Sequence, residues 1–146
     1  MSDIVMPAAQ TLKFKGKVYQ LQPAEAQDFE DVAAFMRAEY MIEEKKHMAG
    51  LPLELAKYAW DKATDFKNKS LRPGKIEFSE ALKSIKALSY LCWLQVKKAH
   101  SDFTIEQATE CINEQFLEAT ETTLKAAGIS ADSNPFPTPQ ETGAAK

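Results

Sequence analysis

The segment from residue 79 to residue 96 constrains the fold more than any other part of the sequence. Ser79 is a typical helix N-cap, and the apolar residues after it surround the second half of the expected helix on nearly all sides. Such a helix has no face suited to water, so it must be buried inside a bundle or in an interface between subunits. The sequence therefore predicts a mainly α-helical fold built around this segment.

Three further helices are expected, at about residues 25–47, 53–68 and 104–128. Each has apolar residues at steps of three and four, which is the period of a helix with one buried face. The last of them begins with a capping-box pattern, formed by Thr104 and Gln107. Together with the central segment they predict a small bundle of about four helices.

A β-hairpin is expected before the first helix. Residues 11–21 alternate apolar and polar side chains on either side of Gly16, a residue that readily adopts the positive φ of a tight turn. Leu12 and Phe14 fall on one face. Because an isolated hairpin is barely stable in water, this face must pack against a helix or another subunit's sheet.

These elements form one expected domain, residues 11–128, since a chain of 146 residues can bury a sufficient core without a disulfide or metal. Residues 1–10 are expected to be a flexible arm, and residues 129–146, which contain three prolines, a flexible tail. A net charge of −3 argues against general affinity for nucleic acid. With no basic leader and no apolar run long enough for a bilayer, we expect an intracellular protein that does not enter membranes.

The sequence carries no recognisable catalytic motif. Phosphate-loop, dinucleotide-binding, zinc-protease and nucleophile-elbow patterns are all missing from it. Glu43, Glu44 and His47 could offer a metal two ligands, but an exposed last helical turn is the favoured interpretation. Cys92 and Cys111 occupy apolar-stripe positions, which favours core packing over metal binding. We therefore expect no enzymatic activity, no metal, no cofactor and no small-molecule substrate.

Aromatic, methionine and acidic side chains provide the candidate partner-binding residues. Trp and Tyr are enriched at interfaces, although they are also common in cores. Acidic residues recur every four positions from Glu106 to Glu118, opposite the apolar stripe of the expected helix. They form either a solvated outer face, the simpler interpretation, or a contact for a basic partner, such as the basic loop 67–75 of another copy. The candidate set comprises Met36, Tyr40, Trp60, Trp93, Glu106, Glu110 and Glu114.

Two runs of sequence resemble the tail assembly chaperone proteins of long-tailed bacteriophages. The first, LKFKGKVYQLQPAEAQDFEDV, combines a glycine-turn hairpin with a proline and an acidic helix start. The second, ALSYLCWLQVKKAHSDFTIEQATECI, combines a mostly apolar helix, a basic pair with His-x-Asp, and a Thr-capped helix. The resemblance implies a small helical protein that binds the phage tape-measure protein in the host cytoplasm and is absent from the finished virion. It also implies a longer product made by translational frameshifting.

The leading hypothesis is therefore a non-enzymatic chaperone that shields the apolar face of a long helical client by helix-in-groove packing. The alternative is a small structural or adaptor subunit retained in the virion, in the tail or the head-tail region, with its hairpin extending a neighbour's sheet. Association between copies of the chain is open under both hypotheses.

Overall fold

The computed structural model describes residues 9–129, so most of the expected tail and of the expected N-terminal arm lies outside the described part. Ile129, the first residue of the expected tail, packs against both buried clusters. The mainly helical class and the N-terminal hairpin are confirmed, but the described residues form six helices instead of about four. The elements in chain order are β1 (Gln10–Phe14), β2 (Lys17–Leu21), α1 (Ala26–Met48), α2 (Leu53–Ser70), α3 (Ile76–Ala81), α4 (Ile85–Lys97), α5 (Ile105–Glu114) and α6 (Phe116–Ala126).

The hairpin pairs β1 with β2 in antiparallel register. Lys15 and Gly16 form its turn with φ angles of 51° and 77°, the left-handed conformations of a two-residue hairpin turn. Leu12 and Phe14 are buried on one face, as predicted, against α4, α5 and α6. Pairing already begins at Gln10, the last residue of the segment expected to be a flexible arm.

The central segment is divided into two helices, because α3 ends at Ala81 and α4 begins after Ser84. The Oγ of Ser84 accepts a hydrogen bond from the backbone N–H of Ala87 at 3.1 Å, so Ser84 is the N-cap of α4. The expectation that Ser79 caps this helix is wrong, since Ser79 lies inside α3. The break between the helices lets Leu82 enter the same buried cluster as Leu91 of α4.

The C-terminal helix is also divided, at Gln115. This residue has φ −130° and ψ 53°, a non-helical conformation that ends α5 and begins α6. The bend turns Ile112 of α5 and Leu124 of α6 into one buried cluster, which a straight helix of this length could not do. Glu118 consequently lies on α6 and does not continue the acidic row of α5.

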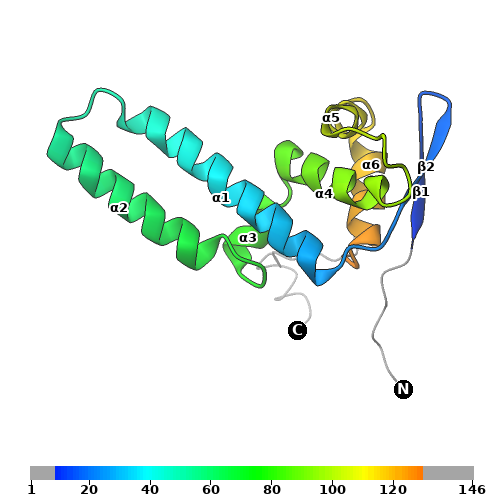
Figure 1. Ribbon diagram of the computed structural model, residues 1–146, viewed down its shortest axis with the longest axis horizontal. Helices are drawn as coiled ribbons and strands as arrows, with labels where there is room; N and C mark the ends of the chain where they lie inside the picture. Colours follow the sequence, from blue (N-terminus) through cyan, green and yellow to red (C-terminus); the bar gives the residue numbers. More distant parts are fainter. Residues whose placement is uncertain (1–8, 130–146) are drawn as a thin grey trace, which may run out of the picture.

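Helix α4 lies at the centre of the fold, between α1 on one side and the hairpin with α6 on the other (Figure 1). Leu88 and Cys92 face a buried cluster shared with the hairpin, α5 and α6. Leu91 and Leu94 face a second cluster shared with α1 and α3. The predicted burial of the second half of this helix is found at residues 91–92 and 94–96, which are covered by elements of the same chain. Tyr90 and Trp93 are half-buried, and Lys86 and Lys97 are exposed.

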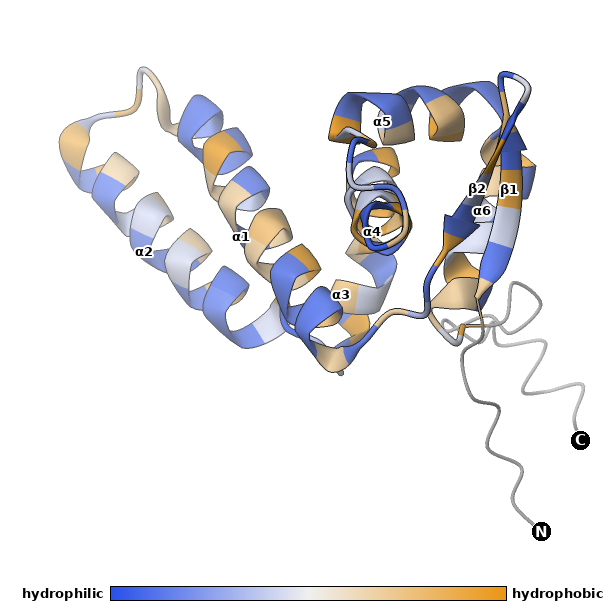
Figure 2. Cartoon of the chain, turned by 45° about the vertical axis from the view of Figure 1, so that its right-hand side comes forward, coloured by the Kyte–Doolittle hydropathy of each residue, from blue (hydrophilic) through white to orange (hydrophobic). Residues whose placement is uncertain are grey.

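Helices α1 and α2 run antiparallel and extend away from the rest of the structure (Figure 1). Helix α2 packs mainly against α1, with a smaller contact to α3. Among the residues of α2, all of which are described, only Ala63 is buried. Hydrophobic residues nevertheless recur along both helices (Figure 2), so much apolar surface of this α1–α2 pair faces solvent.

The start of α1 is fixed to the end of α4 by Asp28. Its carboxylate accepts a hydrogen bond from the backbone N–H of Glu25 at 2.8 Å and lies 2.5 Å from the ammonium of Lys98. Lys98 also donates to the carbonyl of Pro23 at 3.1 Å. Asp28 is buried, so these contacts replace the water that its charge would otherwise bind. One carboxylate thus caps α1 and anchors it.

Replacing Asp28 with Ala should lower the free energy of unfolding by about 2–3 kcal/mol, because the cap is lost and Lys98 keeps no carboxylate partner. Urea denaturation followed by circular dichroism measures this. Asp31→Ala is the matched control, since Asp31 only accepts a bond from Gln27 on the helix surface, worth roughly 0.2–0.5 kcal/mol. Equal losses in the two variants would contradict the anchoring role of Asp28.

Candidate partner-binding groove

An open groove of about 500 Å³ lies between α1, the C-terminal end of α2, α3 and the first turn of α4. Its position follows from the fold, because α1 packs against both α2 and α4, and α3 contacts α2. The volume lies in the range of binding pockets, roughly 300–1,000 Å³. The groove is therefore the candidate functional site.

The floor of the groove is apolar and aromatic. The rings of Tyr40 and Phe66 lie 5.1 Å apart between their centroids and join α1 to α2. Phe35 stacks on Tyr90 of α4 with centroids 4.3 Å apart and an interplanar angle of 13°. Leu71 closes the end of the groove, and the guanidinium of Arg37 donates to its carbonyl at 2.9 Å. These contacts hold the walls in place, so the floor is already formed without a partner.

The edges of the groove are acidic. Among its described lining residues, Lys86 is the only basic one, whereas four are glutamates, which we call the acidic rim: Glu39, Glu43, Glu77 and Glu80. Two of them belong to α1 and two to α3, so carboxylates border the floor from two sides. The local balance of four to one contrasts with the whole chain, which has 21 acidic and 18 basic residues.

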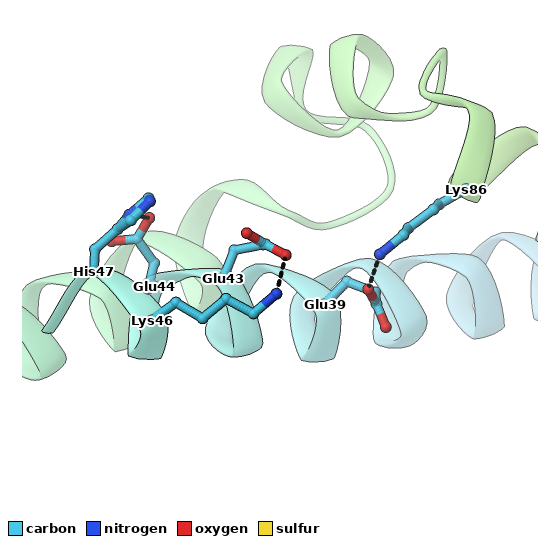
Figure 3. A network of polar contacts seen from close by, with 6 residues as sticks. All are labelled: Glu39, Glu43, Glu44, Lys46, His47 and Lys86. Atoms are coloured by element: carbon cyan, nitrogen blue, oxygen red, sulfur yellow. Dashed lines mark hydrogen bonds and ion pairs between the residues drawn. The ribbon is translucent and has the colours of Figure 1, made fainter. Parts of the chain in front are cut away.

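Two ion pairs lie along the α1 edge (Figure 3). Lys86 of α4 reaches Glu39 at 2.9 Å, and the hydrogen bond to this carboxylate raises the pKa of Lys86. Lys46 lies 3.1 Å from Glu43, and its hydrogen bond lowers the pKa of that carboxyl group. Partial burial, with a smaller effect of Glu44, raises the pKa of Tyr40, so its phenol is neutral at physiological pH. The groove therefore presents a neutral floor and charged edges.

Two of the residues predicted from the sequence, Met36 and Tyr40, line this groove. Trp60 does not, because it precedes Phe66 by six residues and so points about 120° away around the axis of α2. Trp93 is packed against both buried clusters, and its indole N–H donates to the carbonyl of Phe103 at 3.1 Å. Its role in the structure is to join α4 to the turn before α5.

The predicted acidic row lies on α5 and comprises Glu106, Glu110 and Glu114. Helix α5 packs against α4 and α6, away from the α1–α2 pair (Figure 1). The carboxylate of Glu110 lies 2.5 Å from the ammonium of Lys15 in the hairpin turn, and this bond lowers the pKa of Glu110. One member of the acidic row is thus already paired within the chain. The structure does not bring this row together with the groove.

Sequence reasoning missed most of the groove. Phe66 lines the groove and is 38% exposed, yet it is not among the residues predicted from the sequence. Glu39 and Glu43 share the spacing of one helical turn with Phe35, a pattern that marks a common face of α1. Glu77 and Glu80 had no usable signal, because α3 was not recognised as a separate helix.

Within residues 9–129, no group of three or more His, Cys, Asp or Glu side chains is arranged to hold a metal ion. Nor does any helix there combine the length and apolar character needed to cross a membrane. Comparison with protein-family models, curated proteins and solved structures gave no match.

Both cysteines should be unreactive in the folded protein. Burial raises the pKa of Cys92 to about 11 and that of Cys111 to about 12, so both remain protonated thiols at pH 8. We expect slow reaction with a disulfide reagent in the native state and rapid reaction of two thiols after denaturation. Ser101→Cys, in an exposed turn, is the control and should react at once. Rapid native reaction of the unaltered chain would contradict the buried placement of the thiols.

Proposed function

We propose that this protein is a non-enzymatic assembly chaperone that binds the apolar face of a helical client. The resemblance to tail assembly chaperones names the client as a phage tape-measure protein, bound in the host cytoplasm before tail assembly. The single observation that carries the proposal is a preformed apolar groove on a helix pair that is otherwise open to solvent.

The distribution of exposed apolar side chains supports this proposal. Within residues 9–129, twelve large apolar side chains are exposed, and seven of them lie between residues 42 and 66. Exposure is thus concentrated on the α1–α2 pair, where Leu53 is 83% and Tyr58 63% exposed. Single exposed apolar residues are ordinary, but a concentration on one element is typical of a protein-binding surface.

The form of the groove favours a helix as the bound element. Its walls are helices, and an amphipathic helix can place one apolar face on such a floor while its polar face stays in water. A tape-measure protein is expected to be a long helix whose apolar face would aggregate before the tail tube forms around it. Covering that face needs apolar surface and no bond-making chemistry.

The alternative, a subunit retained in the virion, requires a free strand edge on the hairpin. The edge of β2 is partly occupied, because the backbone N–H of Gln20 donates to the ring of His100 at 3.1 Å. Just after the strand, the N–H of Gln22 donates to the carbonyl of Gln95 at 3.0 Å. These contacts disfavour sheet extension through β2, so a retained subunit would have to pair through β1.

Co-expression with the tape-measure protein tests the proposal. The two chains should purify together, and Tyr40→Ala/Phe66→Ala should weaken binding at least about tenfold, because it removes the aromatic floor. The control is Val18→Ala, which removes an exposed apolar side chain on the hairpin and should leave binding unchanged. Circular dichroism verifies that both variants are folded.

Mass spectrometry of purified phage particles separates the two hypotheses. The chaperone should be missing from finished particles. Its presence in stoichiometric amount would support the retained subunit instead, and failure of the two chains to associate would refute the proposed client.

A further inference from the structure

We propose that the groove selects a basic amphipathic helix, with apolar side chains on the aromatic floor and Lys or Arg side chains against the acidic rim. This inference rests on the proposed function, because it specifies the client segment that the same groove binds. The partner is thereby defined by its chemistry: one apolar face flanked by positive charge.

The acidic rim supplies the charge complementarity. Four carboxylates and one lysine line the groove, although the chain as a whole is nearly balanced in charge. Glu39 and Glu43 already have exposed lysine partners, Lys86 and Lys46, whereas Glu77 and Glu80 add charge on the α3 side. Carboxylates of like sign on both sides of an apolar floor repel one another, and a cation between them relieves that repulsion. An apolar helix flanked by Glu would meet the same charge and be excluded.

Lys86 shows how a cation is held at this edge. Its ammonium comes from α4 and meets Glu39 of α1 at 2.9 Å (Figure 3). The lysine side chain is 67% exposed, so water competes strongly with this pair and the contact is easily exchanged. A lysine of a client helix can therefore join or replace Lys86 without breaking a buried interaction.

The spacing of the rim favours a helical partner. Glu39 and Glu43 are four residues apart on α1, a rise of about 6 Å, and Glu77 and Glu80 are three apart on α3, about 4.5 Å. Both edges thus repeat a carboxylate about once per helical turn. Basic side chains at positions i and i+4 of a client helix recur at the same distance. An extended strand would find no free backbone edge here, because the groove's walls are helices.

A second copy of the chain is the less suitable occupant. Its most positive described segment, residues 67–75, was expected to be a loop, but residues 67–70 form the end of α2 and only 71–75 are non-helical. This segment therefore provides no separate amphipathic helix that could lie on the floor of another copy's groove.

Synthetic helical peptides of equal length test the selectivity. The first has a leucine face flanked by Lys, the second has the same face flanked by Glu, and the third is a scramble of the first without an apolar face. Fluorescence anisotropy at low and high salt measures their dissociation constants. The Lys-flanked peptide should bind the full chain at least about tenfold more tightly than either of the others.

Variants of the rim locate the selectivity. Glu77→Gln/Glu80→Gln should weaken binding of the Lys-flanked peptide about fivefold and reduce its salt dependence, because two attracting charges are lost. The matched control, Glu106→Gln/Glu114→Gln on α5, removes the same charge outside the groove and should leave binding unchanged. Chemical-shift changes in the NMR spectrum should fall on the lining of the groove.

Equal binding of the Lys-flanked and Glu-flanked peptides, both lost in Tyr40→Ala/Phe66→Ala, would overturn charge selection and leave the proposed function intact. Selective binding of the Lys-flanked peptide, together with no association with the tape-measure protein, would support charge selection and refute the proposed client. Tight binding of the scrambled peptide, or equal weakening by the α5 control, would show general charge attraction and overturn the inference. A dimer of the chain in sedimentation equilibrium that Glu77→Gln/Glu80→Gln dissociates would also overturn the inference, because the groove would then bind a second copy.

Discussion

The packing of α4 between two buried clusters is the constraint on which the rest of the structure depends. One face of this helix is covered by the hairpin, α5 and α6, and the opposite face by α1 and α3. Each of these elements thereby gains a core, while the face of α4 that carries Lys86, Tyr90, Trp93 and Lys97 stays partly exposed. The second helix packs mainly on α1 and keeps apolar side chains in solvent. The groove is thus a consequence of how the central helix distributes its partners.

The position of α1 decides the geometry of the groove. Its first turn is anchored to the end of α4 through Asp28 and Lys98, and its middle is joined to α4 by the stacked rings of Phe35 and Tyr90. Beyond that point it follows α2, to which the contact between Tyr40 and Phe66 binds it. One helix therefore belongs both to the core and to the solvent-exposed pair. A partner at the groove would therefore bind a surface whose shape is already fixed by the core.

Local chemistry made part of this structure predictable. The capping box of Thr104 and Gln107 forms as expected, with the N–H of Gln107 donating to the Oγ of Thr104 at 3.1 Å. Local sequence does not decide whether Ser79 or Ser84 is the N-cap of the central helix. The position of the cap depends on Leu82 reaching a cluster built by distant segments. The same holds for the site. The pattern of a single helix was enough to predict Met36 and Tyr40 as candidate partner-binding residues. Glu77 and Glu80 were not predicted, because the continuous apolar pattern hides the helix break that places them on α3.

Two groups of acidic side chains, the row on α5 and the acidic rim of the groove, differ in their surroundings. Each has carboxylates paired within the chain: Glu110 with Lys15 on α5, and Glu39 with Lys86 and Glu43 with Lys46 on the rim. The row on α5 is not among the residues that line the groove. Charge alone in water gives weak, salt-sensitive attraction with little discrimination between partners. The acidic rim borders an aromatic floor, so the partner that we propose would have to satisfy charge and apolar shape together. Such a double requirement would distinguish one helical segment from the many basic or apolar ones it would meet.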